Sequence, residues 1–383
     1  MQFEFATASR IVFGCGKVGA LPAIVKEFGT RALLITGRNT SRVEPVARAL
    51  ADAGIEPSLF AIEGEPTVDA VRWGAHAARS DTDVVIGFGG GSAIDAGKAI
   101  AALAANDGDV LEYLEVVGQG KAIPNAPLPY IAVPTTAGTG SEVTRNAVLG
   151  SPEHGVKASL RSPLMLPRIA VIDPELTFAL PPTITASTGL DSLTQLIEPY
   201  VSARANAMTD LFCIEGMRRV AGALQRAFSD GSDREARESM SYAALLGGLS
   251  LANAGLGVVH GFAAPVGGMF DAPHGAVCAA ILPHGMAANL RALRERDEGG
   301  PALRRYEEVA QLLMGNSQAE AEEGIDWIRR LCRDLQVPPL RAYGVSAEHL
   351  PDLVSKAASA SSMKANPIVL TAEELTETLR ASI

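Results

Sequence analysis

The first half of the chain alternates short apolar runs with amphipathic stretches, and this alternation limits the fold more than any other feature. The apolar runs are RALLITG from Arg31, SLFAIEG from Ser58, DVVIGFGGG from Asp83 and PYIAVP from Pro129. Strands that alternate with helices in this way form parallel sheets covered by helices on both faces. We therefore predict a Rossmann-like, dinucleotide-binding α/β domain over residues 1–180.

The pattern changes after Pro181, where helical periodicity replaces the apolar runs and turns are marked by glycine and proline. The segments that suit helices are 186–202, 208–227, 234–254, 277–293, 302–314, 320–335 and 371–382. A chain of 383 residues with 47% apolar composition is long enough to bury the cores of two domains. We predict an all-helical second domain over residues 181–383.

Charge and cysteine content narrow the possible partners and the compartment. The formal net charge is −10 and is spread along the chain, so no basic surface for nucleic acid or an anionic membrane is expected. The four cysteines lie far apart and form no CxxC pair. This spacing favours reduced thiols with ordinary buried roles in a cytoplasmic protein.

Two stretches have the position or length of a targeting or membrane segment. The opening residues, MQFEFATASRIVFG, alternate like a strand and do not resemble a signal peptide. Residues 239–270 contain no Asp, Glu, Lys or Arg, and are long enough to cross a bilayer. Because glycine, Pro265 and His260 interrupt this segment, we interpret it as buried helices and expect no membrane partner.

A glycine-rich turn, GFGGGSAIDAGK from Gly87, follows a predicted strand and opens a predicted helix. Glycines let the backbone approach an anion closely, and Ser92 is expected to cap the helix whose positive end faces the phosphates. The stretch does not match GxGxxG, because Ser92 occupies the last glycine position. The alternative is a tight strand-to-helix turn without a ligand.

A second turn, PTTAGTGSEVT from Pro134, combines hydroxyl side chains with glycines between a strand and an acidic helix start. These groups can donate hydrogen bonds to a pyrophosphate or a ribose. A capping box made by Ser141 or Thr139 with Glu142 is the alternative. Two such turns in one sheet favour a dinucleotide.

The end of the first apolar run bears on the choice between NAD and NADP. Enzymes that select NAD usually place a carboxylate after this strand, whereas enzymes that take NADP replace it and add a cation. This chain has Gly37 and Arg38 there, followed by Arg42, with no carboxylate. We count Gly37 among the cofactor-binding residues and expect use of NADP or of both cofactors, although a solvated loop would have a similar sequence.

A candidate metal site is formed by Asp191 and Gln195, four positions apart, together with His260 and His274. Residues at i and i+4 share one face of a helix. Pro265 and the neighbouring glycines prevent one straight helix between the histidines. The two helix ends that carry them can therefore fold toward each other. A buried carboxylate without a partner costs several kcal/mol, and a cation offsets this cost. The four side chains suit Fe²⁺ or Zn²⁺ with one position open, unless the histidines are core residues and Asp191 is a helix cap.

These residues lie in motifs that resemble the iron-containing (group III) alcohol dehydrogenases. The motifs are GGGSAID, PTTAGTGSEVT, IDPELTFALPP, TASTGLDSLTQLIE and HGFAAPVGGMFDAPHG, in the family's order over nearly the whole chain. The resemblance implies a dinucleotide-binding α/β domain and a helical, metal-binding domain, an architecture shared with dehydroquinate synthase. It also makes a homodimer the expected assembly.

Site residues follow from the resemblance position by position. The implied cofactor contacts are Gly89, Gly90, Gly91 and Ser92 at the pyrophosphate, Asp95 nearby, Thr135, Thr136, Thr139 and Thr144 at the nicotinamide, and Lys157 and Leu176. Asp191, His260 and His274 match three metal ligands. Gln195 departs from the family, which usually has histidine there, and Ala264 replaces a histidine thought to assist proton transfer.

The function implied is reversible hydride transfer between a small alcohol and NAD or NADP, with the metal bound to the alcohol oxygen. A metal-independent enzyme similar to maleylacetate reductases is one alternative, and Gln195 favours it mildly. A lyase of the dehydroquinate synthase type would need cationic residues that the segment 239–270 lacks. A catalytically silent binding protein of the same fold is the alternative from another class.

Overall fold

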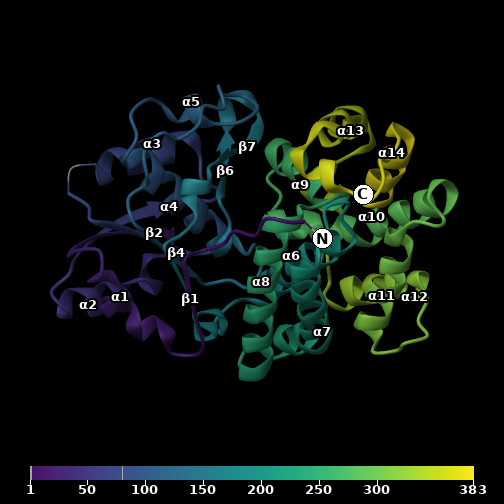
Figure 1. Ribbon diagram of the computed structural model, residues 1–383, viewed down its shortest axis with the longest axis horizontal. Helices are drawn as coiled ribbons and strands as arrows, with labels where there is room; N and C mark the ends of the chain where they lie inside the picture. Colours follow the sequence, from purple (N-terminus) through teal and green to yellow (C-terminus); the bar gives the residue numbers. More distant parts are fainter. Residues whose placement is uncertain (1, 80) are drawn as a thin grey trace. The chain divides into compact units, whose positions relative to one another are not determined.

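The computed structural model describes residues 2–79 and 81–383, which form two compact units. One unit consists of residues 6–136 and 140–178, and the other of residues 2–5, 137–139 and 179–383. Figure 1 shows that the first is built from strands and helices and the second from helices. The assignment of residues 1–180 to the cofactor and of 181–383 to metal and substrate stays a prediction.

The α/β unit contains a six-stranded parallel sheet in the order β1-β8-β5-β4-β2-β3. The strands are β1 (Arg10–Phe13), β2 (Arg31–Gly37), β3 (Glu56–Ile62), β4 (Val84–Gly89), β5 (Tyr130–Pro134) and β8 (Ile169–Ile172). The predicted Rossmann-like parallel sheet is confirmed. Every residue of β4 is buried, which is expected for a parallel strand covered on both faces.

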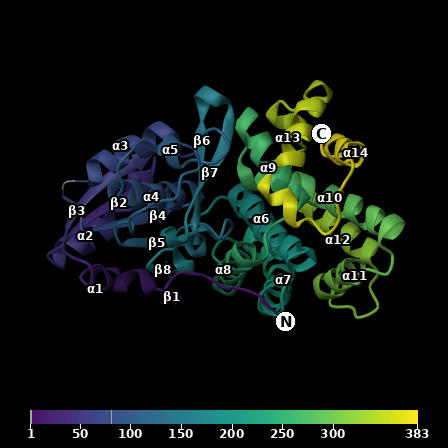
Figure 2. The same ribbon diagram turned by 45° about the horizontal axis from the view of Figure 1, so that its top comes forward.

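Separate apolar cores lie on the two faces of this sheet. Leu33 and Ile35 of β2 belong to one core and Leu34 to the other, because successive side chains of a strand point to opposite faces. The unit's helices are α1 (Leu21–Val25), α2 (Glu44–Asp52), α3 (Val68–Ala78), α4 (Gly91–Ala104) and α5 (Val110–Tyr113). Figure 2 shows α1 and α2 on one face and α3, α4 and α5 on the other.

The strand order reverses between β2 and β4, which pair in register from Ala32 opposite Val84 to Thr36 opposite Phe88. Open α/β sheets bind ligands outside the carboxyl ends of the strands at such a reversal. Gly37 and Gly89 meet at this edge, since a Cβ added to Gly89 would lie 3.8 Å from the Gly37 nitrogen. The fold therefore brings the first glycine-rich turn beside the loop that is predicted to select NAD or NADP.

The predicted helix start after the second turn is wrong. Ser141–Val143 forms one 3₁₀ turn, and an antiparallel hairpin follows, made of β6 (Asn146–Ser151) and β7 (Val156–Arg161). The burial of β6 alternates residue by residue, which is the period of a strand with one covered face. The opening residues are also less regular than predicted, since the first strand begins only at Arg10.

The second unit contains only helices as regular elements among its described residues. They are α6 (Pro182–Val201), α7 (Ala207–Ser229), α8 (Arg234–Ala254), α9 (Val258–Met269), α10 (His274–Arg296), α11 (Pro301–Met314), α12 (Ala321–Asp334), α13 (Leu350–Ser359) and α14 (Ala372–Ala381). The predicted helical domain is confirmed; α9 lies in the segment 239–270 that was predicted only as buried helices, and α13 was not predicted. Helices α6, α7 and α8 lie side by side in both ribbon views, and α10 packs on α6 (Figures 1 and 2).

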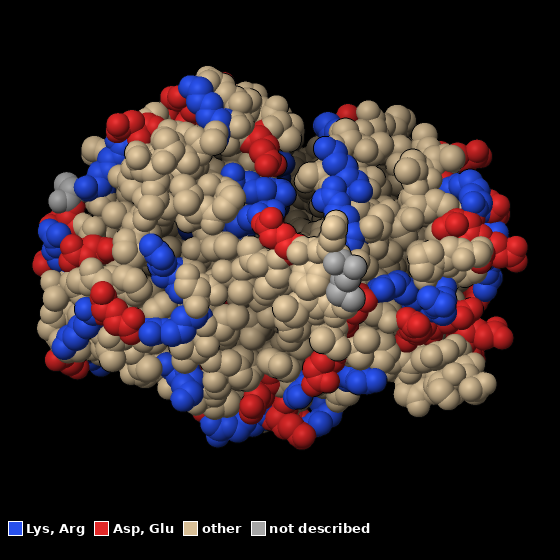
Figure 3. All heavy atoms as spheres, viewed as in Figure 1, with Lys and Arg blue, Asp and Glu red and all other residues tan. Residues whose placement is uncertain are grey.

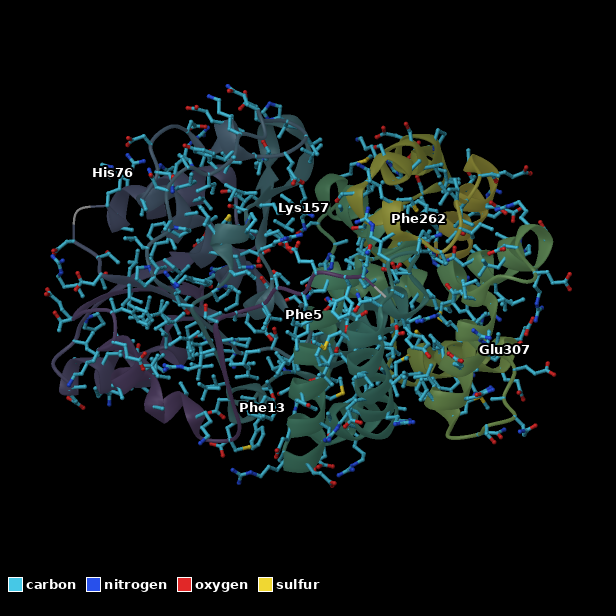
Figure 4. All side chains as sticks on the ribbon, viewed as in Figure 1. Phe5, Phe13, His76, Lys157, Phe262 and Glu307 are labelled. Atoms are coloured by element: carbon cyan, nitrogen blue, oxygen red, sulfur yellow. The ribbon has the colours of Figure 1, made fainter. Side chains whose placement is uncertain are left out.

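The charge-free segment 239–270 forms the last part of α8 and all of α9, which are bent by 99° at the intervening break. Gly255 adopts a left-handed φ of 75° at that break, a conformation that glycine favours. Phe262 of α9 is fully buried (Figure 4). Among the described helices α10 alone is long and apolar enough to cross a bilayer, and 83% of its most apolar stretch is buried inside the protein.

Candidate functional site

The two polar residues of α6 that were predicted as ligands both lie in the interior. Asp191 is 0% exposed and Gln195 is 2% exposed. They are one turn apart on a helix that runs without interruption from Pro182 to Val201. The helix therefore points two polar side chains into the interior of the helical unit.

The two histidines approach Asp191 from different helices. His260 lies in the first turn of α9, and His274 is the first residue of α10 after a non-helical break that contains Pro273. Nε2 of His260 is 3.3 Å from Oδ1 of Asp191, and Nε2 of His274 is 3.6 Å from the same oxygen. The predicted break between the helices thus brings both imidazoles to one carboxylate, with ring centroids 5.4 Å apart.

Several polar atoms at this site are buried without a hydrogen-bond partner among the described residues. They are both carboxylate oxygens of Asp191, Oε1 of Gln195 and Nε2 of His260. An unsatisfied buried polar atom costs about 1–3 kcal/mol, more when it is charged. All of these atoms can donate a lone pair, and one divalent cation beside Asp191 and His260 would satisfy the atoms of those two residues together. The side chains present therefore fit a metal ion of the Fe²⁺ or Zn²⁺ type.

Glu198 is a functional residue that the sequence reading missed. Its Oε2 accepts a hydrogen bond from Nδ1 of His260 at 2.7 Å, and its Oε1 accepts one from the backbone N–H of Val259, also at 2.7 Å. A proton held on Nδ1 leaves the Nε2 lone pair free for a metal, as carboxylates do for metal-bound histidines in general. The signal was available, because Glu198 stands seven residues after Asp191 on the same helix face.

Cys278 is the second missed residue: it is a buried free thiol, as predicted, but it lies beside the candidate ligands. Its Sγ lies 3.7 Å from Nε2 of His274, one turn earlier on α10. One ligand atom each from Asp191, His260, His274 and Cys278 lie within 4.8 Å of one another. The other cysteines are outside this group, and all four are free thiols.

Electrostatics couple the members of this cluster. Burial raises the pKa of Asp191, but the neighbouring imidazoles of His274 and His260 outweigh it and hold that pKa below its usual value. Burial lowers the pKa of His260, yet Cys278, Asp191 and Glu198 together raise it well above its ordinary value. A cation at this site would compete with protons for the same atoms.

In the α/β unit, the first glycine-rich turn connects β4 to α4. Gly90 is the N-cap of α4, so Ser92 lies inside the first helical turn and the predicted cap by its side chain is wrong. No side chain caps this helix end. The N–H groups of Gly91 and Ser92 at the positive end of a 14-residue helix suit an anion such as a pyrophosphate.

The second turn lies against the first. The backbone N–H of Thr135 donates to the carbonyl oxygen of Gly89 at 2.8 Å, and a Cβ added to Gly90 would lie 3.4 Å from the Thr136 methyl group. The alternative capping box is absent, because Gly140 caps the 3₁₀ turn and no side chain does so. Thr139 belongs by its contacts to the helical unit rather than to this one.

Two of the residues assigned to the cofactor have hydrogen bonds inside the protein. Asp95 accepts hydrogen bonds from the Ser141 hydroxyl and from the Val148 backbone N–H. Thr144 is buried and accepts from Nζ of Lys98 at 2.9 Å, while that ammonium also donates to the Ser141 carbonyl at 2.8 Å. These bonds hold the second turn against α4, so Asp95 and Thr144 brace the turn.

The remaining predicted cofactor residues are Lys157 and Leu176. Lys157, labelled on β7 in Figure 4, forms an ion pair with Glu65 at 3.3 Å. The carbonyl oxygen of Leu176 accepts a hydrogen bond from the Arg42 guanidinium at 2.8 Å. That bond places Leu176 beside the loop that follows Gly37.

Charged side chains are mixed over the surface. In Figure 3 the lysines and arginines alternate with aspartates and glutamates on the face drawn, and no broad basic area is visible there. Many of them pair with an opposite charge, as Arg226 does with Asp233 at 2.9 Å.

Comparisons with known proteins agree with this fold. The model of the iron-containing alcohol dehydrogenase family matches residues 8–174, and the model of the C-terminal part of that family matches residues 185–383. Alcohol dehydrogenase 4 of Saccharomyces cerevisiae is 36% identical over 355 residues, which are 92% of this chain and 88% of that protein.

Solved structures match the chain over its whole length. A crystal structure of 1,3-propanediol oxidoreductase has a TM-score of 0.92 and 33% identity, with 100% of both chains covered. Sulfoacetaldehyde reductase from Bifidobacterium kashiwanohense, solved in complex with NAD⁺, has a TM-score of 0.87 and 30% identity, with 100% of this chain and 99% of that chain covered. The chain therefore belongs to the iron-containing alcohol dehydrogenase family.

Proposed function

We propose that the protein transfers a hydride reversibly between a small alcohol and NAD(P)⁺, with Fe²⁺ or Zn²⁺ held by Asp191, His260 and His274 and with Gln195 as the predicted fourth ligand. An NAD(P)-dependent, metal-dependent alcohol dehydrogenase is what the family implies. The observation that supports the metal site most directly is the group of buried atoms without hydrogen bonds around Asp191.

The residues around the proposed metal site have separate tasks in this proposal. A bound divalent cation would act as a Lewis acid that lowers the pKa of an alcohol or polarises a carbonyl. Asp191 supplies negative charge, and Glu198 fixes the imidazole of His260 so that its Nε2 faces Asp191. Ala264 has no proton to give, so a water chain or a group on the substrate must carry the alcohol proton away.

The cofactor-binding assignments stay predictions, and the α/β unit supports them to different degrees. We propose that the backbone N–H groups of Gly91 and Ser92 bind the pyrophosphate, with Gly89 and Gly90 leaving room for it. The adjoining threonine turn, together with Lys157 and Leu176, completes the proposed site. Asp95 and Thr144 contribute by holding that turn in place.

The substitution Gly37→Asp is expected to shift cofactor preference toward NAD by tenfold or more. A Cβ at Gly37 meets no atom within 4 Å, so the side chain fits. A carboxylate there accepts from the ribose 2′-hydroxyl of NAD and repels the 2′-phosphate of NADP. The measurement is the ratio of kcat/KM for the two cofactors, and an unchanged ratio would show that this loop does not contact the ribose.

The activity itself is tested with the full chain purified without chelator. We expect a change in reduced-nicotinamide absorbance with a panel of small alcohols and aldehydes, lost after chelation and restored by Fe²⁺ or Zn²⁺. Full activity of metal-free protein would contradict the metal's role and favour an enzyme similar to maleylacetate reductases. No turnover with any substrate, with or without metal, would favour a silent binding protein.

Three finer statements stay predictions. A homodimer is proposed because the family resemblance makes it plausible, and a cytoplasmic location because all four cysteines are free thiols. The substrate is proposed to be a small alcohol or aldehyde, since small and apolar residues, among them Val266 and Phe270, follow His260 in the sequence.

A further inference from the structure

Cys278 lies among the metal-ligand candidates and is fully buried on α10. Its Sγ is within 4.8 Å of ligand atoms from Asp191, His260 and His274. These residues come from three helices, α6, α9 and α10. Thiol, imidazole and carboxylate groups converge on one point, where all but the 35% exposed His274 are buried, and the thiol has no role in the function proposed so far.

The distances between these atoms are those of ligands around one ion. Atoms bonded to one Zn²⁺ at about 2.0–2.3 Å lie roughly 3.3–3.6 Å apart when the bond angles are near tetrahedral. The carboxylate-to-imidazole distances are 3.3 Å for His260 and 3.6 Å for His274, and the sulfur-to-imidazole distance is 3.7 Å. These three interatomic distances therefore fit ligands of one ion.

We propose that Cys278, as its thiolate, is a direct ligand of the divalent cation and takes the coordination position predicted for Gln195. The proposal rests on the proposed function, because both require a cation beside Asp191. His274 and Cys278 are four residues apart and share one face of α10, so a single helix presents two ligands.

Gln195 is the poorer candidate for two reasons. Its Oε1 lies beside α8, since a Cβ added to Gly247 would be 3.4 Å from that oxygen. Its amide is also neutral.

The ligand types also indicate which metal is preferred. A thiolate, two imidazoles and a carboxylate suit Zn²⁺ or Co²⁺, whereas ligand sets made only of oxygen suit Mg²⁺, Ca²⁺ or Mn²⁺. The chain thus keeps the family's carboxylate and two histidines and replaces the usual third histidine by a thiolate from another helix.

A titration with Co²⁺ tests directly whether the Cys278 thiolate is a ligand. The full chain is freed of metal with chelator and titrated with Co²⁺, and a thiolate-to-cobalt charge-transfer band in the near ultraviolet is expected at one ion per chain. Cys278→Ser should abolish the band and weaken Co²⁺ binding by at least roughly 100-fold. Substituting a residue that only hydrogen-bonds to a metal ligand already lowers metal affinity by about 10–100-fold. X-ray absorption of the zinc-loaded wild type should show sulfur at about 2.3 Å from zinc.

Two variants serve as controls. Cys213→Ser changes the other fully buried cysteine, on α7, and should leave the band intact. Gln195→Leu should also keep the band. One cobalt bound without the band, or zinc without sulfur, would overturn the proposal while the proposed function stands. A wild-type chain that binds no Co²⁺, Zn²⁺ or Fe²⁺ would overturn the proposed function and this inference with it.

Discussion

Asp191→Asn is expected to lose nearly all bound metal and to lower kcat/KM by at least about 1,000-fold. Asp191 Oδ1 lies within 3.6 Å of Nε2 of both imidazoles, so this carboxylate is the common point of the cluster. An amide of the same size keeps the shape of the buried site and removes its negative charge. Metal content by elemental analysis and kcat/KM for the best alcohol measure the two effects.

The matched control is Asp326→Asn on α12, where the carboxylate is 58% exposed and pairs with Arg329. An exposed ion pair of this kind contributes about 0–1 kcal/mol, so metal content and activity should stay at wild-type values. Thermal unfolding shows whether each variant is folded. A folded Asp191→Asn protein with a full complement of metal and undiminished turnover would contradict the metal site.

Much of the site was predictable because its signals are local. Asp191 and Gln195 stand one helical turn apart in a run of apolar residues, and proline and glycine between the histidines indicate a break where one is needed. Glu198 and Cys278 carry the same kind of signal, one or two turns from a predicted ligand. They were missed because the sequence does not say which buried polar or thiol group points toward which neighbour.

The fold was predictable where periodicity is strong and less so where single residues dominate. The boundaries of α8 and β2 match the predicted segments, since each has a clear pattern and clear ends. The bounds of α9, which lies in the predicted buried helices of 239–270, were not predicted because Pro265 lies inside it and suggests a break. Ser92 was assigned as a cap because serine favours that position, but the turn of the chain at Gly90 starts the helix earlier.

Packing between α6 and α10 decides whether the ligand atoms meet, and Gly275 controls that packing. A Cβ added to Gly275 would lie 2.5 Å from the carbonyl oxygen of Ser187 and 2.9 Å from its carbonyl carbon. Both atoms are backbone atoms of α6 and cannot rotate away. Glycine therefore allows α10 to approach α6 closely enough for His274 and Cys278 to reach Asp191.

Gly275→Ala is accordingly expected to push the start of α10 away from α6, lowering stability by about 1–3 kcal/mol and metal affinity by roughly 10–100-fold. Ligand geometry tolerates only about 0.5 Å of displacement, so a modest shift of one helix suffices. Metal titration and thermal unfolding, each with and without metal, measure the two losses.

Gly222→Ala on α7 is the matched control, because a Cβ at Gly222 meets no atom within 4 Å. Alanine is the better helix former by about 1 kcal/mol, so this variant should be slightly stabilised and bind metal normally. The same intrinsic gain opposes the clash in Gly275→Ala inside α10, so a net loss of stability there understates the cost of the backbone clash. Wild-type metal affinity in Gly275→Ala would show that the close approach of the two helices is not what assembles the site.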